Sequence, residues 1–255
     1  MKTIFYKIEC LTNLHVGSGD VNYNIIDNEV EKDPVTGYPI IHASGVKGAL
    51  RDDMKNRGEQ FLNKVFGFAG KGDTGNSGSH KFLDAYLISR PMRVCGSTKT
   101  ASVSVVTIAS VNQYLEKLSA FGMNHYGIDR IDAPDFGEYS FLTNAEENIS
   151  IEGEKTGKLS GITLKQLFKL SDILGTTFAV VKDFNDYDLP VMARNYLEKG
   201  ISKNLWYEEF VPHGSVFYFS VICHDDVENL EFSNVVQFGG NASIGCGFTK
   251  ITALG

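Results

Sequence analysis

Apolar residues recur along this chain in two patterns, one typical of strands and one typical of helices. Short runs rich in β-branched and aromatic residues predict strands at residues 3–14, 82–94, 101–109, 177–181, 215–223 and 248–254. Helical spacing of apolar residues predicts helices from residue 44 towards 65 and over 111–121, 162–174 and 227–236. Because strands and helices follow one another without a regular βαβα alternation, we expect an α+β fold rather than a doubly wound sheet.

Three segments depart from this pattern. Residues 66–80 are rich in glycine and serine and predict an exposed loop. Residues 122–160 are irregular and polar, which predicts an insertion that decorates the core. Residues 183–207 are polar with scattered apolar positions and predict a long hairpin or arm. We therefore expect a single domain over residues 1–255 that carries these additions.

Composition indicates a folded protein. The chain has 255 residues, of which 42% are hydrophobic, enough for a substantial core. It has no apolar run long enough to span a membrane and no signal-peptide pattern at its start, so we expect a cytoplasmic protein with no membrane partner. The scattered cysteines predict free thiols rather than a zinc site; they are Cys10, Cys95, Cys223 and Cys246.

The net charge of −7 argues against a free-standing, non-specific nucleic-acid binder. A local basic groove on an acidic body can still follow phosphates, especially where neighbouring subunits complete the groove. The charge therefore favours an assembly over solitary binding.

Two glycine-rich loops lie near the two ends of the chain. The first is HVGSG at residues 15–19, and the second carries Gly239, Gly240, Gly245 and Gly247 before the last predicted strand. Glycine leaves backbone amides free to point at a phosphate, but a structural turn is the commoner explanation for such a cluster alone. The second loop has no Walker ending and opens no helix inside a βαβ unit, which disfavours a nucleotide-cofactor site.

His15, in the first loop, has two interpretations of about equal weight. As a titratable side chain beside glycines it is a candidate general base or a contact for a phosphate or a base. Alternatively, it hydrogen-bonds within its own loop and fixes that loop in place.

Ser44 is the expected N-cap of the first helix. Lys47 and Arg51 lie four residues apart and therefore share one helical face. A helix N-terminus and two cations are together suited to a bound anion, although a solvated basic face is the commoner explanation for such a pair alone.

Acidic residues are concentrated between the first loop and this helix: Asp20, Asp27, Glu29, Glu31 and Asp33. Such carboxylates are candidates for holding a hydrated divalent metal ion or for polarising a nucleophile, although most acidic loop residues only face water. No HExxH, GxSxG or Cys-His pattern accompanies them.

Taken in order, these motifs form a set: HVGSG at 15–19, IDNEV at 26–30, DPVTGYPII at 33–41, SGVKGALR at 44–51 and the glycine loop at 239–247. This set resembles the RAMP superfamily of CRISPR-associated proteins. Within it, the chain looks most like the repeated backbone subunit of type III-B (Cmr) effector complexes. The narrower similarity is carried by LDAYLISRPMRV at 83–94, VVKDF at 180–184, LPVMAR at 189–194 and WYEEFVP at 206–212.

The resemblance implies a modified RRM-like, ferredoxin-type core and a subunit that stacks into a helical filament along a guide RNA. It also implies a thumb hairpin, expected within residues 185–207, that interrupts the guide–target duplex at regular intervals. An acidic loop residue then cuts the target RNA there with a divalent cation, Mg²⁺ or Mn²⁺. Asp27 matches that residue and is the tentative metal ligand, with Asp33 as the alternative.

RNA contacts follow from the same resemblance. Guide-backbone contacts are expected at Lys47 and Arg51, and further contacts at Ser44, Gly239, Gly240, Ser243, Gly245 and Gly247. His15 matches a loop histidine whose role is structural or RNA-contacting. The implied partners are guide RNA, target RNA, copies of the chain itself, a large polymerase-like subunit, small helical subunits and other RAMP subunits.

The residues leave other functions open. The chain could be a guide-binding module that does not cut, or a guide-processing endoribonuclease of the same superfamily that works alone and without metal. A small-molecule enzyme is disfavoured because cofactor motifs are missing.

Overall fold

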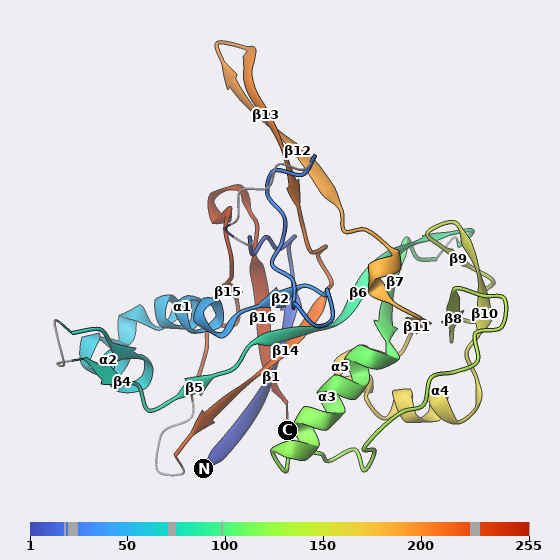
Figure 1. Ribbon diagram of the computed structural model, residues 1–255, viewed down its shortest axis with the longest axis horizontal. Helices are drawn as coiled ribbons and strands as arrows, with labels where there is room; N and C mark the ends of the chain where they lie inside the picture. Colours follow the sequence, from blue (N-terminus) through green and yellow to red (C-terminus); the bar gives the residue numbers. More distant parts are fainter. Residues whose placement is uncertain (18, 20–24, 71–74, 98, 225–229, 255) are drawn as a thin grey trace. The chain divides into compact units, whose positions relative to one another are not determined.

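The computed structural model describes residues 1–17, 19, 25–70, 75–97, 99–224 and 230–254 (Figure 1). These residues form two compact units. The first unit comprises 1–86, 189–213 and 218–255, and the second comprises 87–188 and 214–217. The first unit therefore contains both glycine-rich loops, the acidic segment and the first helix.

A sheet in the order β15-β16-β1-β14 forms the centre of the first unit. Its strands are β1 (Lys2–Cys10), β14 (Val216–Cys223), β15 (Val236–Gln237) and β16 (Phe248–Leu254). β1 and β16 pair antiparallel from Phe5 opposite Leu254 to Cys10 opposite Thr249. The first and last strands of the chain are thus neighbours in the sheet. On β14, the short strand β5 (Lys81–Phe82) forms a further antiparallel pair.

Helices α1 (Ala43–Asp53) and α2 (Glu59–Phe66) belong to the same unit. Val46, Leu50 and Met54 are buried, as their helical spacing predicted. The expected continuous helix towards residue 65 is wrong, because a 3₁₀ turn (Lys55–Arg57) separates α1 from α2. The short strands β2 (Ile40–Ile41), β3 (Gly67–Phe68) and β4 (Asn76–Ser77) flank these helices, and β3 pairs with β4.

A long antiparallel hairpin projects from this unit (Figure 1). It consists of β12 (Val191–Glu198) and β13 (Ile201–Glu209), paired from Val191 opposite Glu209 to Glu198 opposite Ile201. A hairpin was expected within residues 183–207. The observed hairpin begins later, at Val191, and ends later, at Glu209, so that β13 also includes Glu208 and Glu209.

The second unit holds a sheet in the order β6-β7-β11-β8-β10-β9. The strands are β6 (Ala85–Cys95), β7 (Ser102–Thr107), β8 (Phe141–Thr143), β9 (Ser150–Ile151), β10 (Glu154–Lys158) and β11 (Phe178–Val181). Its helices are α3 (Ile108–Ala120), α4 (Gly161–Phe168) and α5 (Ser171–Leu174), with a 3₁₀ turn at Phe184–Asp186. Thr107 caps α3, because its side chain accepts a hydrogen bond from the Ser110 amide at 3.0 Å.

The helix expected at 111–121 is confirmed, and each expected strand segment contains a strand, although β1 ends at Cys10 and the segment 82–94 is divided between β5 and β6. The chain has a mixed α/β fold with a sheet-rich core. Three expectations need correction. The helix at 162–174 is two helices, α4 and α5. Part of the expected irregular segment 122–160 enters the sheet as β8, β9 and β10, because short runs such as Phe141–Thr143 are buried.

The third correction concerns the helix expected at 227–236. Residues 230–235 are not helical and lead into β15, while 227–229 lie outside the described residues, as do 71–74 of the glycine-rich segment. No helix in the described ranges is long and apolar enough to cross a membrane.

Candidate nucleic-acid interface

The two glycine-rich loops lie against each other, although more than two hundred residues separate them in sequence. The Gly240 amide donates a hydrogen bond to the His15 carbonyl at 2.8 Å, and the Gly247 amide donates to the Asn13 carbonyl at 2.8 Å. A Cβ atom at Gly239, where φ is +73°, would clash with the His15 carbonyl oxygen. This close approach requires glycine, so the loops form one surface whose backbone is fixed by both chain ends.

Within this surface, different parts of the second loop have different roles. Gly239, Gly240 and Gly247 are occupied in joining the two loops. Ser243 and Gly245 are exposed around the 3₁₀ turn Ala242–Ile244. Gly239 and Gly240 are exposed as well, whereas Gly247 is buried, so four of the five loop residues expected to contact RNA are accessible. Ser18, in the first loop, lies outside the described residues.

His15 joins the first loop to the base of the hairpin. Its side chain is buried, and its Nδ1 lies 2.8 Å from the Glu209 carbonyl oxygen. Because a carbonyl only accepts, Nδ1 carries the proton and donates. The ring also packs against Phe210, with centroids 5.4 Å apart. These contacts are the ones expected if His15 fixes its own loop in place. An RNA contact by His15 remains a prediction.

Asp27 lies along the edge of β13. Its amide donates to the Tyr207 carbonyl at 3.1 Å, and its carboxylate Oδ2 accepts from the Tyr207 amide at 2.8 Å. Asn28 forms a parallel bridge with Glu208, and the Glu209 amide donates to the Asn28 carbonyl at 2.9 Å. The Asp27 side chain is exposed. The result is an accessible carboxylate whose orientation is fixed by a backbone amide of the hairpin.

The other acids of this segment have different environments. Asp33 is buried and accepts hydrogen bonds from the Val35 amide at 3.0 Å and the Thr36 hydroxyl at 3.2 Å, so it builds a turn. Glu31 lies 3.2 Å from Nε2 of His42. Asp20 lies outside the described residues. The two rival aspartates thus differ in exposure, because Asp33 is buried within its turn and Asp27 is exposed.

Glu208, which was not singled out from the sequence, connects three segments. Its side chain is buried, and its carboxylate accepts hydrogen bonds from Arg194 Nε at 3.1 Å and Trp206 Nε1 at 2.9 Å, both in the hairpin. It also accepts from Asn28 Nδ2 at 3.3 Å and from Asn241 Nδ2 at 3.0 Å. One carboxylate therefore links the hairpin, the Asp27 segment and the second glycine loop.

Burial raises the pKa of the Glu208 carboxyl, but the hydrogen bonds from Trp206 and Arg194 and the charges of His15 and Arg194 outweigh burial and lower the pKa below its ordinary value. The folded state thus favours ionised Glu208. The resulting stabilisation is present above the ordinary carboxyl pKa and is lost as pH falls through the lowered value.

Glu209 supports the same segment from the other face of β13. Its carboxylate lies 3.1 Å from Lys32 Nζ and accepts a hydrogen bond from the Val30 amide at 3.1 Å. A pair of acids within a stretch of aromatic and apolar residues, WYEEFVP, was the available sequence signal. A buried carboxylate needs hydrogen-bond donors or cations around it. Two acids in an otherwise apolar and aromatic stretch could therefore have indicated a pair of buried, partnered carboxylates.

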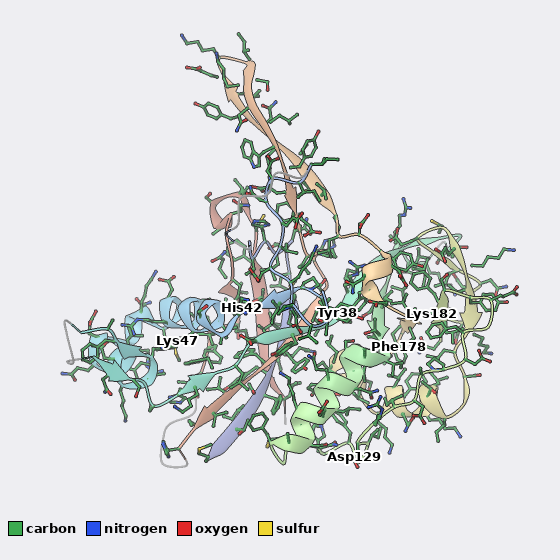
Figure 2. The ribbon with its side chains drawn as sticks, viewed as in Figure 1. Tyr38, His42, Lys47, Asp129, Phe178 and Lys182 are labelled. Carbon is green, nitrogen blue, oxygen red and sulfur yellow. The ribbon has the colours of Figure 1, made fainter. Side chains whose placement is uncertain are left out.

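Helix α1 begins differently from the sequence expectation. His42, and not Ser44, is the N-cap residue, and the cap is provided by Asp84, whose Oδ1 accepts from the Ala43 amide at 2.6 Å. Ser44 is exposed in the first turn (His42 and Lys47 are labelled in Figure 2). The expected Ser44 cap is wrong because the Asp84 carboxylate, from a distant segment, accepts the hydrogen bond of the first helical amide. The negative charge of Asp84 also disfavours binding of a further anion at this helix N-terminus.

Lys47 and Arg51 lie on one face of α1, as their spacing predicted. Lys47 is exposed. Arg51 is partly buried, and its guanidinium donates to the Gly67 carbonyl at 2.8 Å and to the Asn63 side-chain oxygen at 3.2 Å. Both residues line the same hollow beside β3 and β4.

Asp27 is an exposed carboxylate in the described part of this region and is available to a divalent metal ion. No group of three or more His, Cys, Asp or Glu side chains able to hold a metal ion occurs in the described part of the chain. Asp27 is exposed, whereas Glu208 and Glu209 already bind protein donors. The residues present therefore fit a cation that takes one carboxylate here and its remaining ligands from water and RNA phosphates, which is common for Mg²⁺.

Comparison with known proteins identifies the family. The sequence profile of the RAMP superfamily matches residues 7–250. The chain belongs to the RAMP superfamily. It is 23% identical over 286 residues to the CRISPR system Cmr endoribonuclease Cmr4 of Pyrococcus furiosus, covering 99% of this chain and 96% of the relative.

Solved structures show the same RAMP fold. A chain of the type III-B Cmr-beta complex bound to cognate target RNA is 22% identical, with a TM-score of 0.74 over 99% of this chain and 97% of that chain. Oligomeric Cmr4 from Pyrococcus furiosus is 20% identical, with a TM-score of 0.73 over 100% of this chain and 98% of that chain.

Replacing Glu208 tests its role in this RAMP chain. We expect Glu208→Gln to lower the free energy of unfolding by about 1.5–3 kcal/mol at pH 7, because charge-assisted hydrogen bonds are removed. In urea titrations the difference from the parent protein should shrink below about pH 4, where the parent carboxyl also becomes protonated. Glu198→Gln, at an exposed position of the same hairpin, is the control, and equal stability of both variants would contradict this role.

The junction between the glycine loops gives a second prediction. We expect Gly239→Ala to lower the free energy of unfolding by at least about 3 kcal/mol, because the added methyl group meets a backbone carbonyl. Gly245 also has positive φ, +85°, but no atom lies near its Cβ position. Gly245→Ala should therefore lose only about 1–2 kcal/mol. If chemical denaturation gave equal losses of unfolding free energy for the two variants, the contact between the loops would contribute nothing to stability.

Proposed function

We propose that this chain is the guide-RNA-binding backbone subunit of a type III-B RNA-targeting complex and cuts complementary target RNA through Asp27. The observation that carries the proposal is the exposed Asp27 carboxylate, held against the base of a projecting hairpin by the Tyr207 amide. A relative over nearly the whole chain is named an endoribonuclease, and a similar fold occurs in a complex bound to cognate target RNA.

In this function the hairpin β12–β13 is the thumb, and the surrounding sheet is the modified ferredoxin-like core. Copies of the chain stack into a helical filament along the guide, as the oligomeric form of a similar protein supports. Large polymerase-like, small helical and other RAMP subunits complete the assembly. Base pairing with the guide reads the target sequence, and the protein recognises the backbone.

Cutting needs little from the protein beyond alignment. The ribose 2′-hydroxyl oxygen attacks the adjacent phosphorus and the bond from phosphorus to the 5′ oxygen breaks. The 5′ oxygen takes a proton from water, so a 2′,3′-cyclic phosphate and a 5′-hydroxyl result. In-line geometry is forbidden in an A-form helix, and a hairpin that splays a nucleotide out of the duplex permits it. Asp27 Oδ2 is held by the Tyr207 amide, so the carboxylate keeps one orientation, in which it either accepts the 2′-hydroxyl proton or holds the cation.

A divalent cation, Mg²⁺ or Mn²⁺, would be held by Asp27 together with RNA phosphate oxygens. When bound, it supplies positive charge against the charge that develops on the phosphate. Asp27 has room for this role because its side chain is exposed.

Asp27 variants test the cutting step. We expect Asp27→Ala and Asp27→Asn both to reduce target cleavage by at least about 100-fold, which is typical for the loss of a proton-transfer group, with guide and target binding nearly unchanged. Asn keeps an acceptor for the Tyr207 amide, so Asp27→Asn separates chemistry from positioning. Glu29→Gln, two residues away, is the control.

Cleavage of a labelled target RNA is followed with added Mg²⁺ or Mn²⁺ and with chelator. Unchanged cutting in Asp27→Asn would contradict the assignment. Absence of cutting by the parent protein in every cation would favour a non-cleaving guide-binding subunit. Metal-free cutting of repeat RNA would favour a guide-processing enzyme.

The guide-binding part of the proposal has its own prediction. Lys47→Ala combined with Arg51→Ala should weaken guide binding by about 10-fold or more and reduce the slope of log affinity against log salt by about 0.7 for each phosphate that the protein no longer neutralises. Lys250→Ala removes an exposed strand lysine elsewhere in the same unit and should change neither quantity. Equal affinity of the double variant and the parent protein across the salt series would exclude these residues as guide-binding groups.

A further inference from the structure

A hollow of about 770 Å³ lies beside α1, between that helix and the β3–β4 pair. Its lining includes Lys47, Arg51, Phe68, His80 and Lys81, and we call it the basic hollow. None of its lining residues belongs to the acidic segment that carries Asp27. All of them belong to the first unit.

The basic hollow is positive although the chain is acidic overall. Its described lining contains no Asp or Glu. Arg51 donates to neutral acceptors, the Gly67 and Leu62 carbonyls at 2.8 and 3.4 Å and the Asn63 side chain, which orient its charge without cancelling it. Lys47 and Lys81 are exposed and form no ion pair within the described residues. An anion is the ligand that this arrangement favours.

An aromatic side chain completes the lining. Phe68, in β3, is 43% exposed, which is unusual for a phenylalanine next to a buried one, Phe66. β3 is pinned by its pairing with β4, and the segment after β4 is held to α2 by hydrogen bonds from the Ser79 amide to the Lys64 carbonyl at 2.8 Å and from the His80 amide to the Val65 carbonyl. The exposed ring therefore has a fixed support and offers a flat apolar face beside the cations.

We propose that the basic hollow seats one nucleotide of the guide RNA, with its phosphate against Lys47 and Lys81 and its base against Phe68. A cationic groove with an aromatic platform is the common means of holding single-stranded nucleic acid without reading its sequence. The volume suits one nucleotide, since ligand pockets span roughly 300–1,000 Å³. This inference rests on the proposed guide-binding function and extends the guide path from α1 to β3 and β5.

Photocrosslinking of the full chain on guide RNA tests the seat of the base. Guides carry 5-iodouridine at one position at a time, and the crosslinked peptides are identified by mass spectrometry. We expect some guide positions, and not all, to crosslink to Phe68. Crosslinks that map only to other residues at every guide position would overturn the proposal.

Affinity measurements over a salt series give an independent readout. Phe68→Ala should weaken guide binding by about 10-fold with no change of salt slope, because stacking involves no charge. Phe68→Leu, which keeps an apolar side chain and guards against a folding defect, should lose part of that affinity. Lys81→Ala should lower both the affinity and the slope, the latter by about 0.7, whereas Lys250→Ala should match the parent protein.

The outcomes separate this inference from the function beneath it. If the parent protein retains no guide RNA, the proposed function itself fails. If the Lys47 and Arg51 double variant weakens binding but Phe68→Ala does not, the guide function stands and the nucleotide seat is wrong.

Discussion

The buried carboxylate of Glu208 is the constraint on which the candidate site depends. Its donors come from the hairpin, from the segment that carries Asp27 and from the second glycine loop. An ionised group removed from water is stabilised only while its partners remain in place, so these three segments cannot separate without leaving a charge unsatisfied. Glu209 and His15 extend the same connection to Lys32 and the first glycine loop.

This connection explains how loops can present a carboxylate in a fixed orientation. Loops are ordinarily the mobile part of a fold, but residues 27–28 pair with the edge of β13 as a short parallel strand would. Asp27 therefore moves with the hairpin. Arg51 is likewise anchored by its hydrogen bond to the Gly67 carbonyl. The protein itself therefore holds both side chains in place, which lowers the entropy that would be lost when a ligand binds.

Much of this could be predicted from sequence, and the failures have physical causes. Strand and helix periodicity located the core elements, and the spacing of Lys47 and Arg51 correctly placed them on one face of α1. Local rules gave Ser44 as the N-cap because they cannot anticipate Asp84, which lies about forty residues further on. Glu208 and Glu209 were missed for a related reason: acidic residues are ordinarily exposed, and only the assembled fold brings them their donors. The basic hollow likewise depends on how β3 and β4 pair, which periodicity does not specify.

The pairing of β1 with β16 has a consequence for synthesis. A chain emerges from the ribosome N-terminal end first, so Asn13 and His15 are made early. Their hydrogen-bond partners Gly247 and Gly240 appear only when almost the whole protein exists. Such long-range contacts form late because closing a large loop is entropically unfavourable. A nascent or truncated chain thus lacks the surface that the two loops form together.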